Sequence, residues 1–134
     1  MTRKPVARSF KSRTKRPAEE QAVPAVLGLA ESALGERKAV DGLVLDLRHL
    51  SDATDFFIIC SGTSDTHVRA IAEHVIATLQ AAGTRPYQVE GLAQGRWVLV
   101  DYVDFVVHVF HPTLRTFYQL EGLWGDAPLR RLTS

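Results

Sequence analysis

The spacing of apolar and polar residues divides the chain into alternating helical and extended segments. Between positions 19 and 38, apolar residues recur at intervals of three and four, which predicts a first helix. Pro24 suits the first turn of that helix, where its missing N–H has no intrahelical partner, and Gly35 is expected to end or fray the helix. At positions 43–47 every second residue is leucine, which predicts a strand with one buried face.

The next two segments carry the clearest patterns. Residues 56–60 are apolar throughout, as expected for a central strand that is covered on both faces. The turn-forming residues 61–65 follow, and then a long helix that is expected to stop at Gly83. One face of this helix carries an apolar stripe made of Val68, Ile71, Ala72, Val75, Ile76, Leu79 and Ala82.

The second half of the chain predicts three more strands and a last helix. Residues 87–90 form a short strand, and residues 96–102 and 104–111 form a hairpin that turns near Val103. The last helix opens at His111-Pro112-Thr113, and one face of it carries Leu114, Phe117, Tyr118 and Glu121. This order of elements indicates an α/β fold, with a mixed sheet of about five strands and packed helices.

Composition narrows the class of protein. A chain of 134 residues with 46% hydrophobic and 23% charged residues is typical of one globular domain. No apolar run reaches the roughly 20 residues that cross a bilayer, so we expect no membrane contact. Cys60 is the only cysteine, which excludes an internal disulfide and multi-cysteine zinc sites and favours a reducing compartment.

The formal net charge of +1 is distributed unevenly along the chain. Positions 1–17 contain no acid and seven basic residues, which are Arg3, Lys4, Arg8, Lys11, Arg13, Lys15 and Arg16. The remaining chain has nine basic and fifteen acidic residues, a formal charge of −6. A basic arm without hydrophobic periodicity is expected to be disordered in isolation and to contact a polyanion such as RNA. An organellar transit peptide and a solubilising extension are the alternatives.

These patterns give a simple division of the chain. We expect residues 1–18 to form the basic, disordered tail, residues 19–128 the folded domain and residues 129–134 a short C-terminal tail. The sequence shows no internal repeat at the periods of solenoid proteins.

Few residues suggest catalysis or metal binding. The turn at residues 61–65 presents amides at a helix N-terminus, but it lacks the lysine of a phosphate-binding loop, so a capped turn is the better interpretation. His67 and His74 lie roughly 10 Å apart along their helix, too far to share one metal ion. His108 and His111 point to opposite faces of a strand. We therefore expect a protein without catalytic residues, metal or cofactor, whose histidines are satisfied or solvated.

The strand at residues 97–102 is more informative. Alternation places Trp97, Leu99 and Asp101 on one face, and it places Val98, Val100 and Tyr102 on the other. The neighbouring strand sorts likewise, with Asp104, Val106, His108 and Phe110 on one face and Phe105, Val107, Val109 and His111 on the other. Both faces are largely apolar, so either helices cover both or one face is left for a partner.

Trp97 allows two interpretations. It is either a core aromatic, with the charge of Asp101 held by a turn, or the anchor of an interface, with Asp101 adding a charged contact. Spacing alone leaves both open.

Several runs of sequence carry a family resemblance. They are DGLVLDLRHLSDATDFFIICSGTSDTHVRAIAEHV, VEG, WVLVDYVDFVVHVF and RTFYQLEGLWGDAP. In this order they resemble the Iojap-like family, also called ribosomal silencing factors, over about residues 22–128. The resemblance implies a mixed α/β domain that is distantly similar to nucleotidyltransferases but lacks their catalytic carboxylate pair, and hence a protein that is not an enzyme.

The resemblance also implies a partner. Members of the family bind ribosomal large-subunit protein fourteen and sterically hinder joining of the small subunit, which represses translation when nutrients are limiting. The interface tryptophan and aspartate of the family match Trp97 and Asp101, and Val98, Leu99 and Tyr102 are neighbouring candidates. The acidic domain would complement a basic ribosomal protein, and the basic tail would add contacts to ribosomal RNA.

Two other expectations concern self-association and compartment. The free protein could pair as a homodimer through apolar surface, and a bacterial cytoplasm is the expected compartment, ahead of an organelle. Two alternatives stay open, namely an assembly factor for the large subunit and a nucleotidyltransferase-like enzyme that holds a nucleotide at the turn of residues 61–65.

Overall fold

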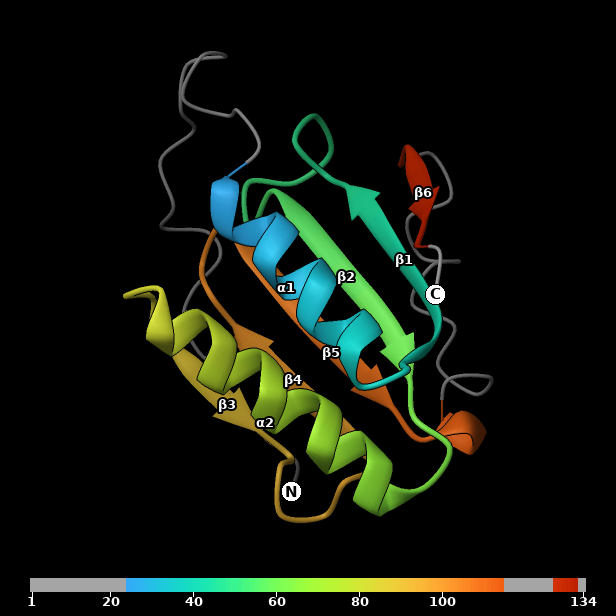
Figure 1. Cartoon of the computed structure of the whole chain (residues 1–134). Coiled ribbons are helices and arrows are strands. Elements are labelled where there is room, and N and C mark those ends of the chain that lie inside the picture. The colour runs from blue at the N-terminus through green and yellow to red at the C-terminus, as the bar shows by residue number, and fades with distance from the viewer. Residues whose placement is uncertain (1–23, 115–126, 133–134) are drawn as a thin grey trace.

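The computed structural model describes residues 24–114 and 127–132 (Figure 1). Its elements are α1 (Ala25–Glu36), β1 (Val40–Asp46), β2 (Phe56–Ser61), α2 (Asp65–Ala81), β3 (Gln88–Glu90), β4 (Trp97–Asp101), β5 (Phe105–Phe110) and β6 (Leu129–Arg131). The last predicted helix begins at Pro112, and most of the face expected for it lies outside the described residues.

The strands form one mixed sheet in the order β3-β4-β5-β2-β1-β6. The central pair, β2 and β5, is parallel, and the other four neighbouring pairs are antiparallel. The prediction of a mixed α/β fold is confirmed, and the predicted hairpin corresponds to β4 and β5. The sheet has one strand more than the five expected.

The additional strand is β6, which lies within the segment expected to be a short C-terminal tail. It pairs with β1 through the partners Leu43↔Arg131, Val44↔Arg130 and Leu45↔Leu129. All three residues of β6 are exposed. The strand therefore has no buried face that could produce an alternation of apolar and polar residues in the sequence. Pairing with β1, rather than a pattern of its own, makes this segment a strand.

Both helices lie on the same face of the sheet (Figure 1). Their buried residues pack against one face of the central strands, and we call this core the helix-side cluster. From the helices it contains Leu27, Ala30, Ala33, Leu34, Val68, Ile71, Ala72, Val75 and Leu79, and from the strands and the β4–β5 turn Val44, Phe56, Ile58, Cys60, Val98, Val100, Tyr102, Phe105, Val107 and Val109. The apolar stripe predicted for the long helix supplies the part of this core that comes from α2.

A second, smaller core lies on the opposite face of the sheet, and we call it the far-face cluster. It contains Leu43, Leu45, Leu47, Ile59, Phe110 and Ala127, with Phe57, Trp97 and Leu114 packed against it. The central strands are therefore buried on both faces, as predicted for residues 56–60.

The two helices end in the same way. In α2 the residue after the helix cap is Gly83, with φ +89°, as predicted. In α1 this position is taken by Lys38, with φ +58°, and Ala39 N donates to the Leu34 carbonyl at 3.0 Å. The expectation that Gly35 ends α1 is wrong, because Gly35 lies inside the helix and Lys38 adopts the left-handed conformation instead.

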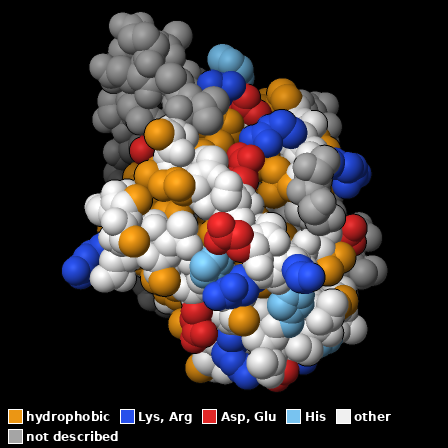
Figure 2. Space-filling view, viewed as in Figure 1, with side chains coloured by type: hydrophobic (Ala, Val, Ile, Leu, Met, Phe, Trp, Pro, Cys, Tyr) orange, Lys and Arg blue, Asp and Glu red, His pale blue; other side chains and the backbone are white. Residues whose placement is uncertain are grey.

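The surface on the helix side of the molecule is mixed in charge and also shows hydrophobic side chains (Figure 2). Figure 2 shows acidic and basic side chains interspersed on this side of the molecule. Within the described ranges, no helix is long and apolar enough to cross a membrane.

Candidate functional site

The structure separates the five candidate residues, four in β4 and Tyr102 in the turn after it, onto two faces of the sheet. Val98 and Tyr102 belong to the helix-side cluster. Trp97 packs against the far-face cluster, and Leu99 and Asp101 share its face because they alternate with Val98. The sorting expected from alternation is confirmed. Consequently, Trp97 and Tyr102 do not belong to one continuous surface.

Trp97 lies at the start of β4 among aromatic side chains, and it stays partly exposed. Its cross-strand partner is Phe110, and the two rings stack with centroids 5.0 Å apart and planes 25° apart. The indole Nε1 donates a hydrogen bond of 3.2 Å to Nδ1 of His108. Stacking and hydrogen bonding thus both act on one side chain.

His108 is buried within this aromatic group, with 3% of its surface exposed. Its ring forms a T-shaped pair with Phe57, with centroids 4.6 Å and planes 72° apart. Burial lowers the pKa of His108 to about 3, so the imidazole is neutral at physiological pH. Because Nδ1 accepts the indole N–H, the proton of His108 is on Nε2, and Nε2 has no hydrogen-bond partner among the described residues. The expectation that His108 has hydrogen-bond partners is therefore met for Nδ1 and not for Nε2.

Asp101 is completely buried at the end of β4. Its Oδ1 accepts a hydrogen bond of 2.8 Å from Val103 N. Val103 has φ +73°, an unusual conformation for a β-branched residue. Thr54 Oγ1 also donates to the Val103 carbonyl, at 2.9 Å. This geometry favours the interpretation in which a turn holds the charge of Asp101.

Tyr102 packs on the helix side of the sheet, where it stacks on Phe105 with centroids 5.0 Å apart. Burial raises the pKa of Tyr102 to about 12. Its hydroxyl has no hydrogen-bond partner within the part of the chain that the structure describes. Its visible contribution is to the core rather than to a surface.

The turn before α2 uses its amides internally. Gly62 N donates to the Phe110 carbonyl at 2.9 Å. Thr63 N donates to Nδ1 of His67 at 2.8 Å, and His67 N donates to Oγ of the N-cap residue Ser64 at 3.1 Å. These amides are satisfied by the chain itself, which favours the capped turn over a phosphate site.

The two histidines of α2 link it to the end of α1. His67 Nε2 lies 2.7 Å from the Arg37 carbonyl, and His74 Nε2 lies 2.6 Å from Oε1 of Glu36. They make separate contacts, as the spacing predicted. Among residues 24–114 and 127–132, no group of three or more His, Cys, Asp or Glu side chains could hold a metal ion.

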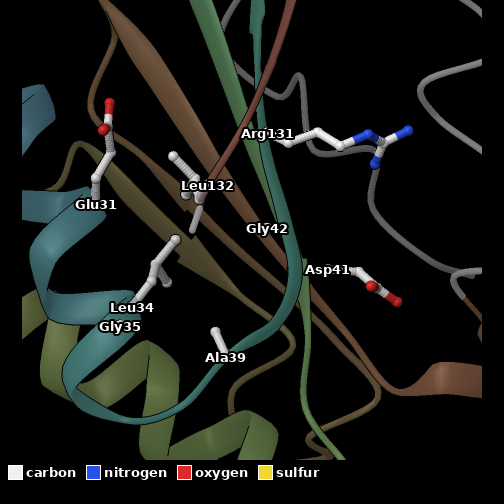
Figure 3. A pocket seen from close by; sticks show the side chains of 8 residues that line it. All are labelled: Glu31, Leu34, Gly35, Ala39, Asp41, Gly42, Arg131 and Leu132. Atoms are coloured by element: carbon white, nitrogen blue, oxygen red, sulfur yellow. The ribbon is translucent and has the colours of Figure 1, made fainter. Parts of the chain in front are cut away.

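A hollow of about 180 Å³ lies between α1 and the edge formed by β1 and β6. Leu34, Ala39 and Leu132 line it, whereas the side chains of Asp41 and Arg131 point away from the two leucines (Figure 3). The polar groups do not converge on a common point, so the hollow is a weaker candidate than the surroundings of Trp97.

The seven basic residues of the N-terminal tail lie outside the described residues. Their contact with RNA stays a prediction.

Comparison with known proteins gives a consistent result. The sequence model of a family described as ribosomal silencing factor during starvation matches residues 20–134. The ribosomal silencing factor RsfS of Bacillus subtilis is 45% identical over 107 residues, which are 80% of this chain and 91% of that protein. The mouse protein named mitochondrial assembly of ribosomal large subunit protein 1 is 33% identical over 96 residues, which are 69% of this chain and 42% of that protein.

Two solved structures share the fold. A crystal structure of a protein from Chromobacterium violaceum matches with a TM-score of 0.73 and 36% identity, over 82% of this chain and 88% of that one. A crystal structure of a protein from Bacillus halodurans matches with a TM-score of 0.70 and 41% identity, over 78% of this chain and 95% of that one.

Proposed function

Because this chain belongs to the ribosomal silencing factor family, we propose that it binds the large ribosomal subunit and prevents the small subunit from joining it. The proposed contact is ribosomal protein fourteen of the large subunit. The bulk of the α/β domain then stands in the path of the small subunit and represses translation when nutrients are limiting. This action needs neither catalysis nor a cofactor, and we place it in the bacterial cytoplasm.

The observation that carries the proposal is the position of Trp97. It is partly exposed on the face of β4 that lies opposite α1 and α2, where Phe110 and His108 hold it. Aromatic side chains that are rigid and partly buried before binding are common energetic centres of protein interfaces. Leu99 and Asp101 are buried on the same face. We therefore propose that they stabilise the strand that presents Trp97 and do not contact the partner directly.

Charge supports the choice of a basic protein as partner. The chain after the basic tail has a formal charge of −6. An acidic domain is attracted to a basic ribosomal protein, and this attraction mainly accelerates association.

Co-sedimentation with purified large subunits tests the proposal. Trp97→Ala is expected to weaken binding by about a hundredfold, as expected for the loss of an interface centre. Tyr87→Ala is the matched control, because Tyr87 is an aromatic residue with 58% of its surface exposed and lies beside β3. A folded Trp97→Ala variant that sediments with large subunits as well as the Tyr87→Ala control would contradict the site.

Asp101 needs a separate pair of variants. Asp101→Asn keeps an oxygen that can accept from Val103 N and removes the charge, whereas Asp101→Ala removes both. If Asp101 acts by supporting the turn, Asp101→Asn retains large-subunit binding and Asp101→Ala loses it together with stability. Equal loss of binding in two stable variants would instead favour a direct charged contact.

A second candidate function is assembly of the large subunit. It is favoured by the likeness to the mouse protein, whose name describes assembly of the mitochondrial large subunit. Sucrose gradients of a deletion strain separate the two functions. Accumulated precursors of the large subunit favour assembly, and mature subunits with altered association favour silencing.

A further inference from the structure

We infer that His108 is a positioning residue for Trp97, which it holds by accepting the indole N–H so that one defined edge of the indole meets the partner. This inference rests on the proposed function of Trp97 as an interface residue. It assigns a role to a buried side chain that has no exposed contact surface of its own.

The register of the sheet brings the two side chains together. Trp97 pairs with Phe110, and His108 pairs with Leu99, so Trp97 and His108 are diagonal neighbours on the same face of β4 and β5. The indole and imidazole rings lie 6.0 Å apart between centroids, and Nε1 of the indole is 3.2 Å from Nδ1 of the imidazole. Long side chains reach across such a diagonal.

The stack on Phe110 and the hydrogen bond to His108 fix different properties of the indole. Stacking fixes the plane of the Trp97 ring but does not select which edge points into the sheet. The hydrogen bond selects that edge, because the indole has a single polar donor and His108 offers a single acceptor. Together they define the orientation of Trp97 before any partner binds, which reduces the loss of entropy on binding.

Packing alone does not explain a histidine at this position. The rings against His108 are those of Phe57, Trp97 and Phe110, and its Nε2 proton has no partner among the described residues. An unpaired buried N–H destabilises the folded state, and leucine would fill this site without that penalty. The acceptor that His108 provides for Trp97 is the property that leucine cannot supply.

Two substitutions of nearly equal shape separate an acceptor from a space-filling role. His108→Asn places a carbonyl oxygen close to the position of Nδ1, and His108→Leu places a methyl group there. Hydrogen exchange of the indole N–H, followed by nuclear magnetic resonance on the full chain, reads the hydrogen bond directly. The resonance of Trp97 is identified by its loss in Trp97→Phe, since the chain has two tryptophans.

The positioning role predicts a specific order of effects. Indole exchange is expected to be about tenfold faster in His108→Leu and within about threefold of the parent in His108→Asn. Affinity for large subunits is expected to follow the same order. Thermal stability is expected to follow the reverse order, because asparagine buries additional N–H groups. Binding that follows stability instead would contradict the inference.

A double-mutant cycle closes the test. In the Trp97→Phe background, His108→Leu is expected to cause no further loss of large-subunit affinity, because it acts through the indole N–H. Unchanged indole exchange in His108→Leu, or full additivity with Trp97→Phe, would overturn the inference. If Trp97→Ala leaves large-subunit binding intact, the proposed site fails, and indole exchange still decides whether His108 holds Trp97.

Discussion

Arg130 forms a two-point ion pair with Glu31, which is ninety-nine positions earlier in the chain. Its Nη1 and Nη2 donate to Oε1 and Oε2 of the carboxylate at 3.0 and 2.7 Å. Arg130 belongs to β6 and Glu31 to α1, so the pair connects the edge strand to a helix that packs on the sheet. Beside it, Leu132 N donates to the Gly42 carbonyl at 2.8 Å, and the Leu132 side chain packs against the helix-side cluster.

Removal of residues 129–134 is therefore expected to lower the free energy of unfolding by on the order of 2 kcal/mol, through lost strand hydrogen bonds and exposure of the core beneath Leu132. Glu31→Gln is the matched control, because it weakens only the ion pair. The side chain of Arg130 is 56% exposed, so this control is expected to lose less than about 1 kcal/mol. Urea unfolding measures both, and equal losses would contradict a structural role for β6.

Lys38→Gly is expected to raise the free energy of unfolding by on the order of 1 kcal/mol, because Lys38 ends α1 with φ +58°. Gly83→Ala, at the equivalent position of α2, is expected to lower it by a similar amount, because φ there is +89°. Thermal unfolding of the two variants checks the opposite signs. A decrease in both would show that the Lys38 side chain stabilises the end of α1.

Tyr102→Phe removes a buried hydroxyl that has no hydrogen-bond partner among the described residues. The free energy of unfolding is expected to stay unchanged or to rise by up to about 1 kcal/mol. Large-subunit binding is expected to be unaffected, because Tyr102 lies on the helix side of the sheet. Co-sedimentation with large subunits compares this variant with Trp97→Ala. A comparable loss of binding in both variants would contradict a contact surface that is confined to the face of Trp97.

The pKa of His108 predicts a pH dependence of stability. Burial lowers this pKa from 6.5 to about 3, and the rings around His108, those of Phe57, Trp97 and Phe110, do not titrate. Between these two values His108 binds up to one more proton in the unfolded chain than in the folded protein. The contribution of His108 is therefore complete above pH 6.5 and decreases as the pH falls towards 3, by at most about 1.4 kcal/mol per pH unit.

Urea unfolding between about pH 4 and pH 7 measures this dependence. His108→Leu is expected to reduce the slope of the free energy of unfolding against pH by up to about 1.4 kcal/mol per pH unit, which corresponds to one proton. An identical slope in the parent protein and the variant would show that His108 is accessible to protons in the folded state.

Local patterns allowed most of the fold to be predicted. The stripe of α2, the apolar run of β2 and the alternation in β4 and β5 are each contained in one segment, and each segment has the predicted structure. Gly83 ends α2 as predicted, since glycine adopts positive φ readily. Lys38 does the same at the end of α1, where the side chain gives no signal of a left-handed conformation.

Features that depend on distant pairing could not be predicted in this way. Residues of β6 become a strand only because β1 presents an unpaired edge. In the candidate site, alternation places Trp97 and Asp101 on one face, but it does not reveal that the carboxylate of Asp101 binds Val103 N. The contact between Trp97 and His108 was missed as well. Its signal was a histidine among the alternating residues of the neighbouring strand, and the register that puts His108 on the face of Trp97 appears only in the folded sheet.

The parallel pairing of β2 with β5 also bears on how the protein folds. In this register Phe56 pairs with Phe105, which lies forty-nine positions later in the chain. The antiparallel pairs β1–β2, β3–β4 and β4–β5 join strands that are consecutive in the chain. The pair β1–β6 is the other long-range pair. Closing so long a loop is slow compared with forming a hairpin. We therefore expect β1–β2 and β3–β4–β5 to form early as two local units. The pairing of β2 with β5 is then expected to limit the folding rate. The same step brings Trp97 of β4 into one sheet with β1 and β2, whose residues form much of the far-face cluster.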